Sequence, residues 1–73
     1  MFSTINKELK TPKGVSEIPF NTLAEDIQSV VFRYSAQHSL ITSDNVGVSS
    51  NDFYLFLYVN DIYNNVFRID IEL

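Results

Sequence analysis

The residues that could do chemistry in this chain are few, and their spacing matches no familiar catalytic site. His38 is the single histidine and cysteine is absent, so a zinc site lacks a second soft ligand. Serines are frequent, but G-x-S-x-G does not occur and no acid is placed to orient His38. The two glycines are too few for a phosphate-binding loop. We therefore expect a protein that is not an enzyme and that uses no metal and no cofactor.

Two further groups of side chains have ordinary structural explanations. Glu25 and Asp26 lie where a predicted helix begins, and the helix dipole stabilises carboxylates in a first turn. Tyr54, Phe56 and Tyr58 share one face of a predicted strand and could stack on nucleobases. A stacking site of this kind usually has basic surroundings, which this acidic chain lacks. Packing in a core or an interface explains the three rings better.

Charge is distributed unevenly along the chain. The formal net charge is −4, with +2 on residues 1–13 and −6 on residues 14–73. Such an acidic body repels nucleic acid, so we expect no direct binding of DNA or RNA. It favours a basic protein surface as partner, although the same charge also serves solubility. No apolar run approaches the roughly 20 residues that span a bilayer, and the N-terminus lacks the core of a signal peptide. We therefore expect a cytoplasmic protein without a membrane partner.

The C-terminal third predicts the element on which the rest of the fold packs. Residues 53–59 are aromatic, β-branched or leucine throughout, which is typical of a strand buried on both faces. Residues 66–73 alternate between apolar and charged side chains, which indicates a half-buried strand. The polar residues between them suit a turn. A hairpin over residues 53–73 follows.

The N-terminal half is expected to supply two helices and an edge strand. The i,i+4 spacing of Ile5 and Leu9 favours a helix over residues 3–10. Residues 15–18 form a short edge strand that a proline ends. A second helix begins near Thr22, in a capping-box pattern.

The length of that second helix has two interpretations. An apolar stripe permits one helix to about residue 38. Alternatively, the helix ends near Ser29 and the β-branched and aromatic run at 30–36 forms a strand, since a longer helix leaves Phe32 facing solvent. We prefer the strand.

The expected fold class is α+β, with short helices packed on an antiparallel sheet of about five strands in a single domain, residues 1–73. Between the strand at 30–36 and the hairpin we expect a tight turn at 37–39, a strand at 40–43 and a mobile loop at 44–52.

Several short motifs, taken in order, resemble the uracil-DNA glycosylase inhibitors, which are small acidic mimics of DNA. The edge-strand motif is Glu-Ser-Ile in that family and is transposed here to Ser16-Glu17-Ile18. The charge is also milder than a DNA mimic usually carries. The other matching segments are the first helix at 3–8, the acidic second helix at 22–27, a strand ending in Thr-Ser-Asp at 40–44, and the final hairpin.

The resemblance implies a monomer that blocks the DNA-binding groove of uracil-DNA glycosylase in a 1:1 complex. Ser16, Glu17 and Ile18 would lie in that groove, and Glu25 and Asp44 would stand in for phosphates. Such enzymes flip a base with the help of an apolar wedge. An apolar cavity for the wedge would be lined by Phe20, Ile27, Val31 and Leu40.

Two other functions fit the same sequence. The chain could be an immunity-type inhibitor of a different basic enzyme, such as a nuclease. It could also be a structural module whose strand edges pair with copies of itself. One continuous helix from residue 22 to residue 38 would weaken the resemblance to the glycosylase inhibitors.

Overall fold

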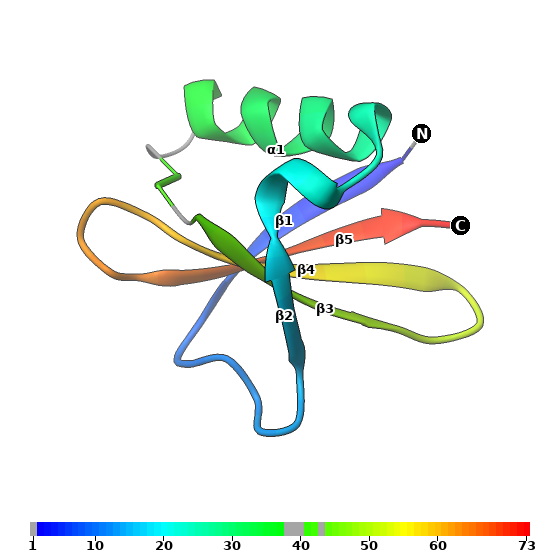
Figure 1. Cartoon of the computed structure of the whole chain (residues 1–73), viewed down its shortest axis with the longest axis horizontal. Coiled ribbons are helices and arrows are strands. Elements are labelled where there is room, and N and C mark those ends of the chain that lie inside the picture. The colour runs from blue at the N-terminus through cyan, green and yellow to red at the C-terminus, as the bar shows by residue number, and fades with distance from the viewer. Residues whose placement is uncertain (1, 38–40, 43) are drawn as a thin grey trace.

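A computed structural model of the chain describes residues 2–37, 41–42 and 44–73. One long helix lies across one side of a five-stranded sheet, as Figure 1 shows, which confirms the α+β class. None of the described helices is long and apolar enough to cross a membrane. The elements in chain order are β1 (Ser3–Glu8), β2 (Ser16–Pro19), the 3-10 helix η1 (Phe20–Thr22), α1 (Glu25–Gln37), β3 (Asn45–Ser50), β4 (Tyr54–Asn60) and β5 (Val66–Glu72).

The sheet has the order β1-β5-β4-β3-β2, and every neighbouring pair is antiparallel. The C-terminal hairpin of β4 and β5 is confirmed and occupies the interior of the sheet. Its register pairs Leu57 with Ile69 and Leu55 with Ile71. The two strands nearest the N-terminus, β1 and β2, form the opposite edges. The edge strand expected at 15–18 is confirmed as β2, displaced by one residue.

The core lies between α1 and the facing side of the sheet. Alternation along the strands places every second side chain on that side. Fully burying an aliphatic side chain of this kind contributes about 1.5–3 kcal/mol. The buried apolar residues are Val30, Val31 and Tyr34 of α1, Val46 of β3, Leu57 and Val59 of β4, and Ile69 and Ile71 of β5.

The strand expected at 30–36 is wrong, because α1 continues without a break to Gln37. Burial of Val30, Val31 and Tyr34 against the sheet outweighs the low helix propensity of β-branched and aromatic residues. Phe32 does face outward and is 61% exposed. Its ring nevertheless packs edge-to-face on Phe20 at 5.4 Å between centroids, which reduces the cost of that exposure.

The helix expected at 3–10 is also wrong. Residues 3–8 form β1, which pairs with β5 from Ser3 opposite Ile71 to Glu8 opposite Val66. Ile5 packs against the core, whereas Leu9 is fully exposed, so the two do not share an apolar face. Six residues of ladder along β5 stabilise this segment more than an isolated short helix could, because short helices are marginal in water.

The segment before β4 differs from expectation as well. The loop expected at 44–52 contains β3, which pairs with both β2 and β4. In the strand expected at 40–43, Ile41 forms only an isolated bridge to Asp61, and residues 40 and 43 lie outside the described residues. Of the turn expected at 37–39, Gln37 ends α1 and the other two residues are likewise outside.

Candidate functional site

The edge strand β2 leaves one side of its backbone without a strand partner in the described part of the chain. Its register places Ser16 opposite Val48, Glu17 opposite Gly47 and Ile18 opposite Val46. Ser16 and Ile18 therefore lie on the α1 side of the sheet, and Glu17 lies on the other side. An unpaired edge offers backbone N–H and C=O groups to another chain.

An open groove lies where β2 ends, between η1 and the C-terminal half of α1. Its volume is about 250 Å³. We call it the α1 groove, and its lining residues are Phe20, Val31, Phe32, Ser35, Ile41, Thr42 and Asp44. Aromatic and aliphatic side chains dominate this lining, with two hydroxyls and one carboxylate as polar groups. A groove of this composition suits an apolar side chain that carries a polar or cationic neighbour.

Backbone hydrogen bonds hold the walls of the groove in place. The N–H of Phe20 donates to the carbonyl oxygen of Asp44 at 2.9 Å. The N–H of Ile41 donates to Ser35 Oγ at 3.0 Å, which ties the segment after α1 back to the helix. The N–H of Thr42 donates to the carbonyl oxygen of Asn60 at 3.0 Å. The groove is thus bounded by residues with fixed backbones.

The structure brings together some of the residues expected at the site. Phe20, Val31 and Asp44 line the α1 groove, and the strand bearing Ser16, Glu17 and Ile18 leads directly into it. Two of the four expected cavity residues and one expected phosphate mimic therefore line the same groove.

Two other expected site residues do not join the groove, and a third cannot be placed because it lies outside the described residues. Glu25 lies in the first turn of α1, whereas the groove contacts the C-terminal half of that helix. Ile27 packs partly buried against the core and is not among the lining residues. Leu40 lies outside the described residues.

Sequence reasoning missed four residues of the groove, namely Phe32, Ser35, Ile41 and Thr42. Phe32 did carry a signal, because a helix through residue 32 exposes a large aromatic ring. On sequence alone that exposure argues against the helix, but in the structure Phe32 lines the groove.

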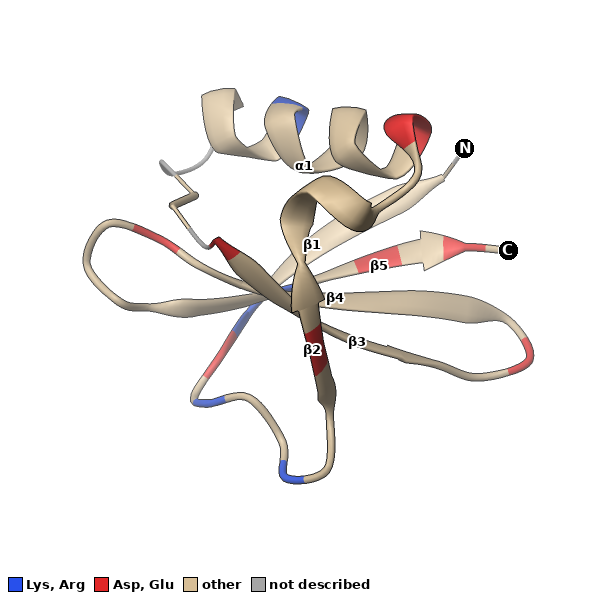
Figure 2. Cartoon of the chain, viewed as in Figure 1, with Lys and Arg blue, Asp and Glu red and all other residues tan. Residues whose placement is uncertain are grey.

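Charged residues are spread over several elements of the fold. In Figure 2 acidic positions lie on β2, β5 and the start of α1, while two lysines lie in the loop between β1 and β2. Among the residues that the structure describes, no group of three or more His, Cys, Asp or Glu side chains could hold a metal ion.

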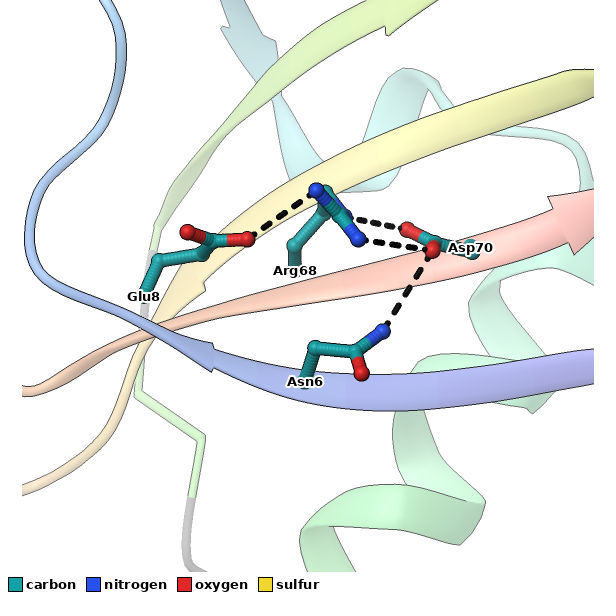
Figure 3. Close-up of polar contacts among 4 residues, drawn as sticks. All are labelled: Asn6, Glu8, Arg68 and Asp70. Atoms are coloured by element: carbon teal, nitrogen blue, oxygen red, sulfur yellow. Dashed lines mark hydrogen bonds and ion pairs between the residues drawn. The ribbon is translucent and has the colours of Figure 1, made fainter.

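A polar network lies on the sheet face opposite α1 (Figure 3). Arg68 donates to Asp70 at 2.6 and 3.0 Å and forms an ion pair with Glu8 at 3.1 Å. Asn6 donates to the same Asp70 carboxylate at 3.3 Å, and the guanidinium lies 5.5 Å from the centre of the Phe56 ring. The hydrogen bonds to Asp70 raise the pKa of Arg68. Because these groups satisfy one another, the network serves to join β1 to β5.

No protein-family model matches the chain, and no curated protein or solved structure matches it. The edge of β2 and the α1 groove are therefore the features of the molecule that bear on its function.

Proposed function

We propose that the chain is an inhibitor that occupies the basic nucleic-acid groove of an enzyme, with uracil-DNA glycosylase as the first target to test. The observation that carries the proposal is the unpaired edge of β2 leading into the α1 groove. Together they offer backbone hydrogen bonds, an apolar hollow and the acidic residue Asp44, with Glu17 on the other face of the same edge strand.

Each part of this surface has a separate role in binding. Glu17 and Asp44 supply negative charge that attracts a basic groove and speeds association. Phe20, Val31 and Phe32 supply the apolar walls that bury a side chain of the enzyme and slow dissociation. The backbone edge of β2 adds hydrogen bonds that do not depend on the partner's side chains.

The resemblance to the glycosylase inhibitors supports this target only in part. In its favour are the Ser16-Glu17-Ile18 motif on an edge strand, the acidic start of α1 and the terminal hairpin. Against it, residues 3–8 form a strand, and α1 continues through residues 30–36. These two differences weaken the glycosylase target, and inhibition of another basic enzyme, such as a nuclease, is the second candidate.

The test is titration of the purified protein against uracil-DNA glycosylase while uracil release is followed. We expect inhibition that is complete at one inhibitor per enzyme. Titration against a basic nuclease, followed by substrate cleavage, tests the second candidate in the same way. If neither enzyme is bound or inhibited at micromolar concentration, which is about −8 kcal/mol of binding free energy, the glycosylase target and this nuclease are both excluded.

A further inference from the structure

A second hollow lies on the sheet face opposite α1, at the end of the sheet where β1 begins and β5 ends (Figure 1). Its volume is about 210 Å³. We call it the Glu72 pocket, and its lining residues are Phe2, Ser3, Thr4, Tyr54, Asp70 and Glu72. Pockets for drug-sized ligands measure about 300–1,000 Å³, so this one suits a single small headgroup. It shares no lining residue with the α1 groove.

The register of the sheet places Glu72 between two aromatic side chains. On β4, Tyr54 is its direct partner. On the β1 side, the N–H of Glu72 donates to the carbonyl oxygen of Phe2 at 2.9 Å, which puts Phe2 opposite Glu72, one residue outside the first pair of the β1–β5 ladder. Cross-strand partners point to the same face of a sheet. The Glu72 carboxylate is therefore flanked by an aromatic ring on each side.

The spacing of these two rings suits a cation held between them. Neighbouring strands lie about 4.8 Å apart, so the positions of Phe2 and Tyr54, on either side of β5, lie about 9.6 Å apart. A cation midway between them is about 5 Å from each ring, within the roughly 6 Å over which a ring attracts a positive charge. A ligand from solvent can reach both rings, because both side chains are exposed.

The next row of the same sheet face already holds a cation in this manner. There the Arg68 guanidinium donates to Asp70 at 2.6 and 3.0 Å and lies 5.5 Å from the centre of the Phe56 ring. Phe56 faces Asp70 across the β4–β5 ladder, one row from Glu72. Within the described part of the chain, no basic side chain forms an ion pair with Glu72. The Glu72 row therefore repeats the ring and the carboxylate without a basic side chain of its own.

We propose that the Glu72 pocket binds a small organic cation that carries a quaternary ammonium headgroup. The Glu72 carboxylate balances the positive charge, and the rings of Phe2 and Tyr54 contact the methyl groups on either side. Recognition of quaternary ammonium groups by aromatic rings is an established use of the attraction between cations and rings.

The hydrogen bonds around the pocket favour a quaternary ammonium over a primary one. A primary ammonium is strongly hydrated and has three donors to satisfy. The Asp70 carboxylate already accepts hydrogen bonds from Arg68 and Asn6, so it has little capacity for another donor. A quaternary ammonium donates no hydrogen bond, and one free carboxylate between two rings is sufficient for it.

The charges near the pocket favour a cation over a neutral ligand or an anion. Arg68 neutralises Asp70, whereas the charge of Glu72 is not paired by any described basic side chain. Arg33 contacts Ser3 Oγ at 2.7 Å from the α1 side, so it lies across the sheet from the Glu72 carboxylate. The chain as a whole carries a net charge of −4, which also attracts a cation.

This site goes beyond the proposed inhibitory function. It is built from β1, β4 and β5, whereas the proposed inhibitory surface is the edge of β2 with the α1 groove. It can therefore be tested on the purified chain without any enzyme.

Titration with choline, followed by the backbone amide signals of the isotope-labelled protein, tests the proposal. Sodium chloride is exchanged for choline chloride at constant total concentration, so that the ionic strength stays fixed. We expect saturable shifts at Phe2, Thr4 and Glu72 with a dissociation constant of about 1–10 mM, as for a small ligand held by few contacts. Dimethylbutanol, the neutral isostere in which carbon replaces the ammonium nitrogen, should bind about fivefold more weakly.

Substitutions in the pocket should weaken choline binding. Phe2→Leu, Tyr54→Leu and Glu72→Gln should each raise the dissociation constant about threefold, because each removes one contact with the cation. Phe53→Leu and Glu25→Gln are the matched controls. Phe53 is exposed but does not line the pocket, and Glu25 lies in the first turn of α1, on the other side of the sheet. Circular dichroism melts establish that each variant is folded.

A parallel titration with the amide of acetylated trimethyllysine identifies the source of the headgroup. Tighter binding than choline indicates a methylated protein side chain, and weaker binding indicates a free small molecule. The absence of saturable shifts up to about 50 mM choline overturns the proposal. So does equal binding of the neutral isostere, or an equal loss in the matched controls. None of these results depends on whether the chain inhibits an enzyme.

Discussion

The backbone N–H of Phe20 donates a 2.9 Å hydrogen bond to the carbonyl oxygen of Asp44. This bond joins the chain leaving β2 to the chain entering β3, just beyond the Pro19–Asn45 pair that ends their ladder. As a result, Phe20 and Asp44 both line the α1 groove. An apolar contact and an electrostatic contact with one partner can therefore be tested by separate substitutions.

The electrostatic part is tested by Glu17→Gln combined with Asp44→Asn. If both carboxylates contact a basic groove, the double variant should weaken the enzyme complex by about 1–3 kcal/mol per desolvated contact. The effect should be larger at low salt, because salt screens charge attraction. Inhibition titrations at two salt concentrations measure it. Asp52→Asn removes the same charge from the turn between β3 and β4 and should leave inhibition unchanged. Full inhibition by the double variant would remove Glu17 and Asp44 from the site.

The apolar part is tested by a pair of phenylalanine substitutions. Thr42→Phe puts a ring into the α1 groove from an exposed position and keeps the backbone hydrogen bond of residue 42, so it should speed dissociation of the enzyme. Ile27→Phe enlarges a side chain that packs on the core outside the groove lining. It should lower the free energy of unfolding by about 1–3 kcal/mol and leave dissociation unchanged. Displacement kinetics and urea unfolding separate the two effects. Faster dissociation from folded Ile27→Phe would instead support the cavity expected from the sequence.

The hairpin was predictable because its signal is local. Phe67, Ile69 and Ile71 alternate with charged residues, and the partner strand is continuously apolar, so no distant segment is needed to interpret either. The segment 3–8 gave no such signal. Ile5 and Leu9 fit a helical spacing, and only the unpaired edge of β5, which a local reading of sequence cannot see, makes this segment a strand.

The groove was only partly predictable for the same reason. The resemblance to the glycosylase inhibitors implies a cavity at Phe20 and Val31 and a phosphate mimic at Asp44. These residues come together because α1 continues past Ser29. Burial against the sheet favours that longer helix, although the local helix propensity of the segment opposes it. Gly47, which falls in a segment expected to be a loop, is instead required by a close approach within a strand.

That close approach gives the next prediction. A Cβ atom on Gly47 would lie 2.9 Å from Val15 Cγ1 and 3.2 Å from Tyr58 Cβ. Gly47→Ala should therefore lower the free energy of unfolding by about 1–3 kcal/mol through overpacking. Val15→Ala removes the nearer methyl group, so the double variant should recover part of the loss in a double-mutant cycle. Strict additivity, measured by urea unfolding, would mean that the Val15 contact is not the cause.

Arg68 should stabilise the fold more through its two hydrogen bonds to Asp70 than through its positive charge alone. Arg68→Met leaves the Asp70 and Glu8 carboxylates without their cation, and Asp70 is only 15% exposed in its side chain. We expect a loss of about 1–3 kcal/mol, with the smaller end favoured because these groups are partly solvated. Arg68→Lys keeps the charge but not the two-pronged contact, and should recover less than half of the loss. Lys13→Met, in the loop between β1 and β2, controls for the change in net charge. A fully stable Arg68→Met variant would contradict this assignment.

Asp61 should make stability fall in acid. Burial alone raises the pKa of Asp61, but hydrogen bonds from Asn65 and Tyr63 and the charge of Lys7 outweigh it, so its pKa is lowered from 3.8. As the pH falls, Asp61 therefore becomes protonated at a higher pH in the unfolded chain than in the folded protein. The stabilisation is complete above pH 3.8 and is lost as the pH decreases through the lower pKa of the folded state.

Asp61→Asn replaces one carboxylate oxygen with an amide nitrogen that cannot accept a hydrogen bond from the Asn65 side chain. It should therefore be less stable than wild type near neutrality, and the difference should shrink in acid. Urea unfolding of both proteins at about pH 7, 4 and 2 measures this convergence, with the exposed carboxylate variant Asp52→Asn as control. A stability difference that stays constant across the three pH values would show that the charge of Asp61 does not hold the turn between β4 and β5.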